Sequence, residues 1–198
     1  MMKNKIKILL IAIFSAFLMT GCQSDKEEDK YMTGKHYVEI NIKDKGVISV
    51  ELDADSAPIT VTNFINLVKE GFYDELTFHR IIEGFMIQGG DPNGNGTGGS
   101  SEKITGEFEA NGIKNEILHK RGVISMARAK SYNSASSQFF IMHEDNESLD
   151  GLYAAFGHVT EGMDIVDDIA ENTEVEDDNG TTLKENQPII ESITVIEK

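Results

Sequence analysis

The order of apolar and polar residues along the chain predicts a protein built mainly of short β-strands. Residues His36–Lys43 and Gly46–Asp53 alternate apolar and polar side chains with a period of two and are joined by Asp44-Lys45. This pattern is typical of a hairpin with one buried face. Further apolar stretches of strand length follow at residues 76–82, 85–88, 123–127, 137–142, 154–159 and 189–196.

Two segments have the spacing of amphipathic helices instead. The first begins at Pro58, which suits the first turn of a helix, and ends at Gly71. Its apolar residues recur at helical spacing: Val61, Phe64, Ile65 and Val68. The second covers residues 163–170, and a polar stretch from residue 173 to 188 is expected to be a surface loop. Many short strands with two helices and few β-α-β alternations predict an all-β fold, a closed antiparallel barrel.

The N-terminal residues have the character of an export signal. Lys3, Lys5 and Lys7 precede an apolar run from Ile8 to Met19, which is too short to span a bilayer comfortably. A signal peptide is therefore expected over residues 1–21. The run ends in Thr20-Gly21-Cys22, which resembles the lipobox of bacterial lipoproteins, although Met19 stands where leucine is more typical.

Cys22 is the only cysteine, so no disulfide can form within the chain. We expect its thiol to carry a lipid, because it directly follows the apolar run and Gly21. The alternative is a free thiol at an ordinary secretory cleavage site. With a lipid on Cys22, residues 22–35 would form the lipid-attachment cysteine and a flexible acidic tether. A single domain over residues 36–198 would follow.

The charge of the chain argues against one class of partner. Removing residues 1–21 takes away three lysines and no acid, which changes the formal charge from −16 to −19. Such a surface repels the phosphate backbone, so no nucleic-acid partner is expected. It also repels an anionic membrane face, which makes a lipid the more suitable means of attachment. The alternative is that the acidity serves only solubility.

Two apolar runs that carry isolated polar side chains are the strongest indication of function: residues 78–91 and 136–142. The period of two places Arg80 on one face with Leu76, Phe78 and Ile82, and places Gln138 with Phe140. An arginine among apolar side chains is costly unless its guanidinium has a task. A cation beside an apolar patch suits an uncharged substrate whose electron distribution changes during the reaction, such as the prolyl peptide bond.

These runs resemble the cyclophilin family of peptidyl-prolyl cis-trans isomerases. The resemblance extends over about residues 36–198 and includes four more motifs: Asn93–Gly99, Gly122–Arg128, Leu149–Gly151 and Phe156-Gly157. It implies a closed eight-stranded antiparallel barrel capped by two α-helices. It also implies an enzyme that isomerises X-Pro bonds in unfolded or partly folded proteins, without cofactor or metal.

The resemblance also implies roles for individual residues. Arg80 would donate to the prolyl nitrogen, with Gln88 and Tyr153 as the other catalytic residues. Gln88 and Gln138 would hold Arg80 and the substrate backbone by hydrogen bonds. The backbone of Ala127 and Arg128 would align the substrate. Tyr153 stands where many members carry histidine. The proline pocket would be formed by Phe85, Met86, Phe140 and Leu149. Ser148 stands where many members carry tryptophan, so weak cyclosporin binding is expected.

Each of these assignments has a simpler alternative. The alternative for Arg80 is a surface salt bridge with Glu83 or another acid, and the alternative for the apolar pocket residues is ordinary core. Residues 94–99 satisfy G-x-G-x-x-G, but no helix is expected after them, so they are interpreted as turn glycines. The five histidines have no metal-ligand spacing. Composition permits Ser-His-Asp hydrolysis, but no G-x-S-x-G elbow is present.

The sequence therefore predicts a lipid-anchored, monomeric prolyl isomerase in the bacterial cell envelope, facing outside the cytoplasm. A non-catalytic module that binds extended proline-containing segments is the alternative; such a module would not need Arg80. A structural protein with an acidic functional face is a third possibility without specific support.

Overall fold

The structure is a computed structural model that describes residues 30–197. The expected signal peptide, Cys22 and most of the expected tether lie outside these residues. Eight strands and two α-helices follow one another along the chain: β1 (Lys35–Ile42), β2 (Gly46–Asp53), α1 (Pro58–Lys69), β3 (Phe78–Ile82), β4 (Met86–Gly89), β5 (Val123–Met126), β6 (Phe139–Met142), β7 (Ala155–Glu161), α2 (Met163–Asn172) and β8 (Ile190–Ile196). The predicted element types are confirmed, and most boundaries differ by only one or two residues.

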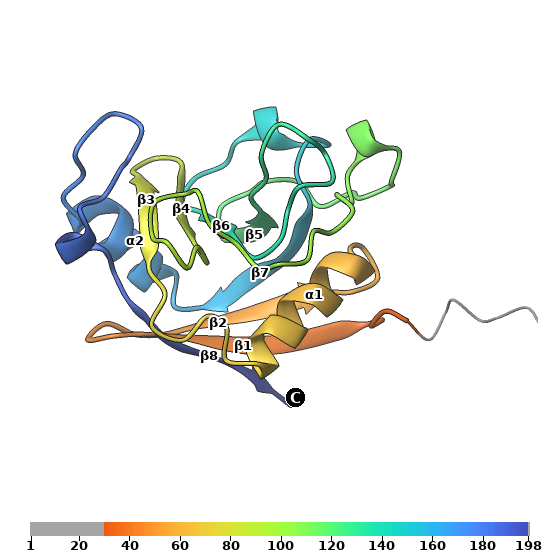
Figure 1. Cartoon of the computed structure of the whole chain (residues 1–198), viewed down its shortest axis with the longest axis horizontal. Coiled ribbons are helices and arrows are strands. Elements are labelled where there is room, and N and C mark those ends of the chain that lie inside the picture. Colours follow the sequence, from red (N-terminus) through yellow and green to blue (C-terminus); the bar gives the residue numbers. More distant parts are fainter. Residues whose placement is uncertain (1–29, 198) are drawn as a thin grey trace, which may run out of the picture.

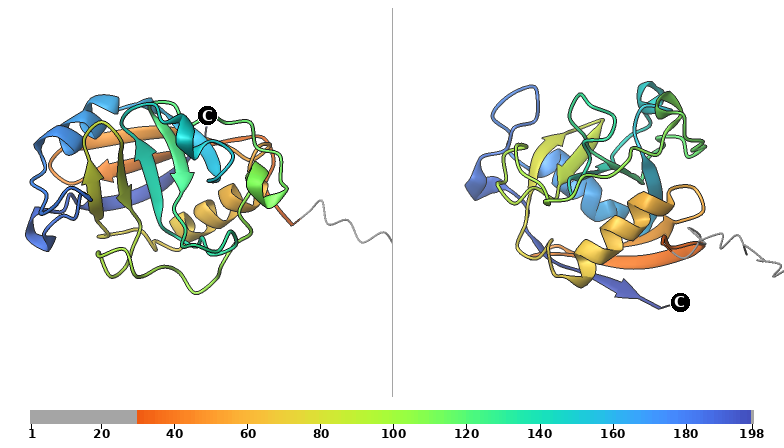
Figure 2. Two further views of the ribbon diagram at one scale, coloured as in Figure 1. Left: turned by 90° about the horizontal axis from the view of Figure 1, so that it is seen from above. Right: turned by 45° about the vertical axis from the view of Figure 1, so that its right-hand side comes forward.

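The strands form one curled antiparallel sheet in the order β3-β4-β6-β5-β7-β2-β1-β8 (Figures 1 and 2). β3 and β8 are therefore the two edges of the sheet, and the prediction of a closed barrel is wrong. The edges meet only at one end, where Ile190 N–H donates to Leu76 O (2.7 Å) and Phe78 N–H donates to Pro188 O (3.0 Å). The result is a half-barrel.

The polar segment between α2 and β8, residues 173–187, explains why the barrel stays open. It lies along the outer edge of β3, where Ile81 N–H donates to Gly180 O (2.8 Å) and Thr182 N–H donates to His79 O (3.2 Å). An edge strand needs partners for its unpaired backbone groups. Because this segment supplies them to β3, β8 pairs along its length with β1 alone.

A β-bulge in β3 changes which of its residues face the site. Phe78 pairs with Gly89, but Arg80 pairs with the adjacent Gln88, so the register shifts around His79. Phe78 consequently packs in the interior of the curled sheet, whereas Arg80 faces outward. The prediction that Phe78 and Arg80 share a face is therefore wrong, because strict alternation holds only without a bulge.

Helices α1 and α2 lie at opposite sides of the curled sheet (Figure 1). The apolar face of α1 is buried as predicted, with Phe64 against the rings of Tyr73, Phe139 and Phe156. Its N-terminus is capped from a distance by the buried Glu107 carboxylate, which accepts the N–H groups of the first turn. Within residues 30–197, no helix is long and apolar enough to cross a membrane.

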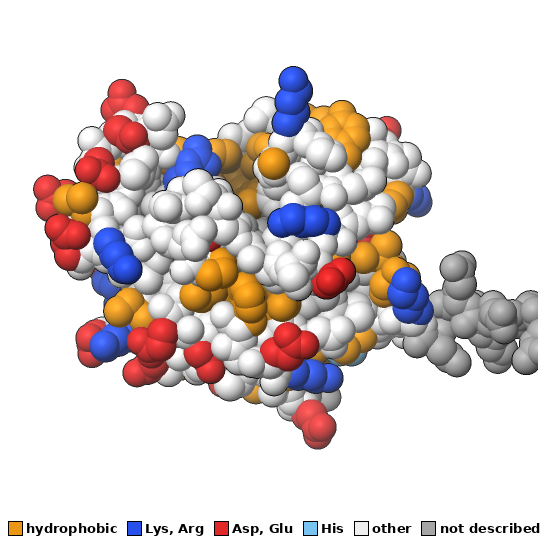
Figure 3. All heavy atoms as spheres, viewed as in Figure 1, with side chains coloured by type: hydrophobic (Ala, Val, Ile, Leu, Met, Phe, Trp, Pro, Cys, Tyr) orange, Lys and Arg blue, Asp and Glu red, His pale blue; other side chains and the backbone are white. Residues whose placement is uncertain are grey.

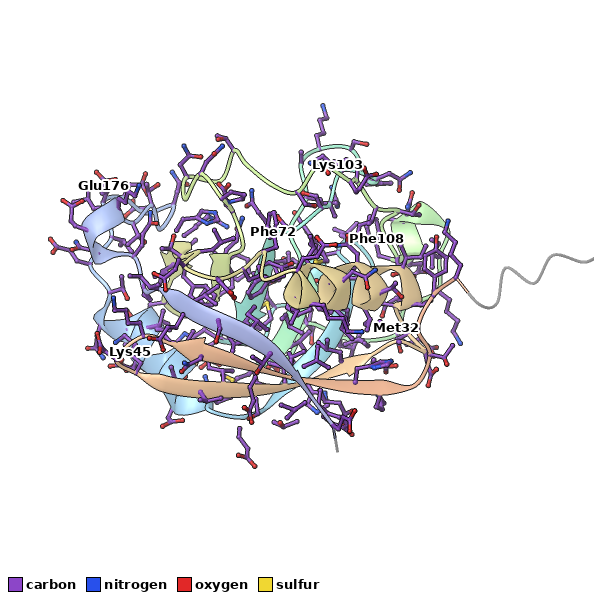
Figure 4. The ribbon with its side chains drawn as sticks, turned by 60° about the horizontal axis from the view of Figure 1, so that its bottom comes forward. Met32, Lys45, Phe72, Lys103, Phe108 and Glu176 are labelled. Atoms are coloured by element: carbon purple, nitrogen blue, oxygen red, sulfur yellow. The ribbon has the colours of Figure 1, made fainter. Side chains whose placement is uncertain are left out.

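The segment before β1 is attached to the domain. Met32 N–H donates to Thr62 Oγ1 (2.8 Å), and the Met32 side chain packs against the core beside α1 (Figure 4). Lys35 is the first residue of β1 and forms ion pairs with Glu51 and Asp53. The last four residues assigned to the tether thus belong to the folded part of the chain.

Candidate active site

The ten side chains that the sequence assigns to the site within the domain converge on one face of the sheet. One cavity of about 250 Å³ is lined by nine of them: Arg80, Phe85, Met86, Gln88, Ala127, Arg128, Phe140, Leu149 and Tyr153. Gln138 lines an adjoining cavity of about 210 Å³, which shares Gln88, Ala127 and Arg128 with the first. Figure 3 shows the hollow in the upper half of the molecule, with apolar side chains inside it.

The apolar walls of the cavity form a hydrophobic cluster of their own. Met86, Phe140 and Met142 belong to this cluster together with the partly buried Phe85 and Leu149. The cluster lies on the opposite face of the sheet from the main core, which contains Phe64, Phe139 and Ile141. Ordinary core would be sealed, whereas Phe85, Met86, Phe140 and Leu149 border an open space that can admit a small apolar ring such as that of proline.

Arg80 is held at the edge of this cavity by neutral acceptors. Its Nε donates to the Asn179 carbonyl oxygen (2.9 Å), and its terminal Nη1 lies 3.4 Å from Gln88 Oε1. Of the ion pairs between residues 30 and 197, none involves Arg80, so the alternative of a salt bridge with Glu83 is not supported. Its positive charge is thus available beside the cavity without a neutralising carboxylate.

The hydrogen bonds continue from Arg80 into the adjoining cavity, and the two cavities together are called the groove. Gln88 Nε2 donates to Gln138 Oε1 (2.9 Å), and Gln138 Nε2 donates to the Gly98 carbonyl oxygen (2.8 Å). This series of hydrogen bonds sets the orientation of both side-chain amides, because the NH₂ group of each must face the oxygen to which it donates. Gln88 consequently presents its carbonyl oxygen to Arg80.

The turn that supplies the last acceptor is organised by Asp91, which is 1% exposed. Its carboxylate accepts the backbone N–H groups of Asn93 (2.8 Å), Asn95 (3.1 Å) and Gly96 (2.6 Å). Burial alone would raise the pKa of Asp91, but these donors outweigh it and lower the pKa. Gly94 and Gly96 have positive φ angles of 61° and 84°, which supports their interpretation as turn formers.

Arg128 has a structural task that the sequence did not reveal. Its guanidinium donates to the Leu152 carbonyl oxygen (2.8 Å from Nη2) and stacks on the Tyr153 ring, with Cζ 4.6 Å from the ring centroid. It thereby joins the segment after β5 to the loop that carries Leu149 and Tyr153. Ser148 in that loop is exposed and donates to Asn146 Oδ1 rather than facing the cavity.

A buried hydrogen-bond relay that sequence reasoning missed lies beneath Phe140, in the wall of the cavity. Asp150 Oδ1 accepts from His119 Nδ1 (3.0 Å), and His119 Nε2 lies 3.0 Å from Ser125 Oγ. The His119 ring stacks on Phe140 with an interplanar angle of 18°. No local pattern could have indicated this relay, since His119 and Asp150 are 31 residues apart.

The relay has the residue order of a hydrolase triad but cannot act as one. Ser125 is 0% exposed and His119 is 1% exposed, so no substrate can reach the hydroxyl. Burial lowers the pKa of His119, and the Asp150 carboxylate offsets only part of this effect. The neutral ring donates to Asp150 and accepts from Ser125. Because the same ring stacks on Phe140, it connects Phe140 to the loop that carries Leu149 and Asp150.

Breaking this relay is expected to loosen the apolar walls of the cavity without removing the Arg80 guanidinium. His119→Phe retains a ring against Phe140 but leaves Ser125 without its ring partner and leaves Asp150 with only the backbone N–H of residue 119 as a donor. We expect KM for an X-Pro peptide to rise severalfold with little change in kcat, and stability to fall by about 1–3 kcal/mol. Ser125→Ala removes one bond only and should have the smaller effect. A fall in kcat at constant KM would indicate a loss of folded protein instead.

Comparison with known proteins agrees with this geometry. Residues 37–195 match the model of the family described as cyclophilin type peptidyl-prolyl cis-trans isomerase. The chain is 42% identical over 144 residues to peptidyl-prolyl cis-trans isomerase B of Bacillus subtilis, covering 73% of this chain and 92% of the relative. It is 43% identical over 153 residues to a peptidyl-prolyl cis-trans isomerase of Helicobacter pylori, covering 76% and 89% of the two chains.

Solved structures of the family have the same fold. A crystal structure of a cyclophilin type peptidyl-prolyl cis-trans isomerase of Cryptosporidium parvum superimposes with a TM-score of 0.73 at 32% identity, covering 83% of this chain and 99% of that one. A second structure of that protein, determined in the presence of the dipeptide Ala-Pro, gives a TM-score of 0.71 at the same identity. The chain belongs to the cyclophilin-type peptidyl-prolyl cis-trans isomerases, and it is an enzyme of that activity.

Proposed function

We propose that Arg80 is the group that lowers the barrier to rotation about the X-Pro bond. That bond resists rotation because the nitrogen lone pair is shared with the carbonyl, and the barrier for peptide bonds is about 18–20 kcal/mol. In the twisted state the lone pair returns to the prolyl nitrogen. A guanidinium N–H directed at this nitrogen interacts more strongly with the twisted state than with either planar state, which is the condition for catalysis.

The remaining site residues would hold the substrate while the bond turns. The proline ring would enter the apolar cavity against Phe85, Met86, Phe140 and Leu149. Gln88 and Gln138 would fix Arg80 and the peptide backbone, and the backbone of Ala127 and Arg128 would align the substrate. The Tyr153 hydroxyl would donate to a carbonyl oxygen. The Ala-Pro dipeptide used with the Cryptosporidium relative supports a proline-containing occupant. No step requires a metal or an organic cofactor.

One observation carries this mechanism: Arg80, which has no carboxylate partner among residues 30–197, borders a cavity of about 250 Å³ with apolar walls, large enough to admit a proline ring. A protease-coupled isomerisation assay with a neutral X-Pro peptide tests it. We expect acceleration over the spontaneous rate, which has a time scale of tens of seconds or longer. Saturable binding of the peptide without acceleration would favour the non-catalytic binding module instead.

We further propose that the enzyme acts on folding proteins outside the cytoplasm, as a monomer anchored by a lipid on Cys22. Lys3, Lys5, Lys7 and the short apolar run to Met19 support export, and Thr20-Gly21-Cys22 supports lipid attachment. Since the folded domain already includes Met32, the connection to the lipid would have about nine residues, from 23 to 31. At full extension such a connection reaches roughly 30 Å.

Cys22→Ser is expected to detach the protein from the membrane, because serine cannot form the thioether that carries the lipid. Two or three acyl chains would anchor the domain stably, whereas one gives only marginal binding. Fractionation and mass spectrometry of the mature N-terminus would measure the change. A wild-type protein with an unmodified Cys22, or with a mature N-terminus elsewhere, would contradict the anchor but not the isomerase activity.

A further inference from the structure

The orientation of the Arg80 guanidinium depends mainly on one backbone carbonyl. Its Nε donates to the Asn179 oxygen at 2.9 Å, whereas the contact between its Nη1 and Gln88 Oε1 is longer, at 3.4 Å. An arginine side chain has many rotamers, and a group that stabilises a transition state must already be in place when the reaction occurs. The position of the Asn179 carbonyl therefore decides where the remaining N–H groups of Arg80 lie beside the cavity.

Asn179 belongs to a turn over residues 177–181 that lies directly against β3 (Figure 1). Gly180 is the point of closest approach: it is buried, has a φ of +78°, and a Cβ on it would collide with the Ile81 carbonyl oxygen. The next residue of the turn, Thr181, pairs with Arg80 itself in an isolated antiparallel bridge. A change in the shape of this turn would therefore move the Asn179 carbonyl relative to Arg80.

The Asp177 carboxylate organises the 177–181 turn. Its Oδ1 accepts the backbone N–H groups of Asn179 and Thr181 (both 3.0 Å), and its Oδ2 accepts the Thr181 hydroxyl (3.0 Å). Two backbone bonds close the turn: Gly180 N–H donates to Asp177 O (2.9 Å), and Glu176 N–H donates to Thr181 O (2.7 Å). The hydrogen bonds from Thr181 and Asn179 lower the pKa of Asp177, so the carboxylate is a charged acceptor at neutral pH.

Asp177 has no other task in the part of the chain that the structure describes. Its side chain is exposed, forms no ion pair within residues 30–197, and lines neither cavity of the groove. All of its hydrogen-bond partners belong to its own turn. An effect of Asp177 on the reaction would therefore be transmitted by the geometry of that turn.

We propose that Asp177 is a positioning residue for the isomerisation: it holds the 177–181 turn in the shape that places the Asn179 carbonyl against Arg80 Nε. This inference rests on the proposed function, because Asp177 touches no part of the groove and acts through Arg80. No residue of the segment 173–187 lines the cavity of about 250 Å³ that would receive the proline ring. Rotation of the X-Pro bond, and not binding of the peptide, should therefore depend on Asp177.

Three single variants test this role with a neutral X-Pro peptide in the protease-coupled assay. Asp177→Ala should lower kcat about three- to tenfold at unchanged KM, the effect of losing a modest interaction that orients Arg80. Asp177→Asn keeps Oδ1 as the acceptor of both N–H groups and should retain most of kcat. Asp178→Ala removes the neighbouring exposed acid, which has no side-chain partner among residues 30–197, and should leave both constants unchanged.

A double variant shows whether Asp177 acts through Arg80. In an Arg80→Ala enzyme, assayed at higher enzyme concentration, adding Asp177→Ala should change kcat/KM less than twofold, because the group that Asp177 positions is absent. Circular dichroism gives the folded fraction to which each rate is normalised. The same loss in both backgrounds, an unchanged kcat in Asp177→Ala, or an equal loss in Asp177→Asn would overturn the positioning role. An Arg80→Ala enzyme as active as the wild type would instead overturn the proposed function.

Discussion

Arg80→Ala is expected to lower kcat/KM for an X-Pro peptide by about 10²–10³-fold, the usual effect of removing one electrostatic donor from an active site. Among residues 30–197 the guanidinium has no carboxylate partner, and it is held by Asn179 O and Gln88 Oε1 beside the apolar walls of the cavity. Its interaction is strongest when the prolyl lone pair is localised, so the loss should fall mainly on kcat. The protease-coupled assay measures both constants.

Two further variants make this prediction specific. Arg80→Lys keeps the charge but loses the planar fork of donors, so it should recover only part of the activity. Arg121→Ala removes an arginine that pairs with Asp167 and borders neither cavity of the groove, and it should leave kcat/KM nearly unchanged. An Arg80→Ala enzyme within twofold of the wild type, at equal stability, would exclude the proposed mechanism.

Phe64→Ala is expected to destabilise the domain by about 3–5 kcal/mol, the usual cost of removing a buried phenylalanine. Phe64 is 0% exposed and lies 5.0–5.5 Å, between ring centroids, from Tyr73, Phe139 and Phe156. It joins α1 to β6 and β7, so the cavity left by alanine would lie at the centre of the main core. Urea unfolding would measure the change as a lower midpoint with a similar slope.

Phe72→Ala provides the comparison for this variant. Phe72 is only partly buried at the margin of the same core and touches Tyr73 with its ring. We expect it to cost clearly less than Phe64→Ala, because solvent can fill the space that it leaves. Equal losses for the two variants would show that α1 is not anchored mainly through Phe64.

Hydrophobic periodicity alone was sufficient to predict the elements of the fold. The alternation in β1 and β2 and the helical spacing of Val61, Phe64, Ile65 and Val68 result from burying one face of each element. Such a face is encoded by residues close together in the chain. The number, type and order of the elements can therefore be predicted without tertiary information.

The position of the site was also accessible from the sequence, through the resemblance of its motifs. Nine predicted side chains line one cavity, and Gln138 lines the adjoining cavity. Isolated polar residues within apolar strands, such as Arg80 and Gln88, are the physical signal, because they would be costly without a task. Their individual roles in the reaction stay predictions, and Cys22 lies outside the residues that the structure describes.

Only the tertiary structure decided how the strands join and what surrounds the site. Alternation could not reveal the bulge at His79, which turns Phe78 inward and Arg80 outward. The sheet stays open because residues 173–187 occupy the edge of β3. Arg80 is held by the Asn179 carbonyl oxygen, 99 residues away in the chain. The relay of Asp150, His119 and Ser125 likewise joins three separate segments. Local pattern fixes which face of an element is buried, whereas competition for backbone partners at a sheet edge and hydrogen bonds between distant segments are settled only when the chain is folded.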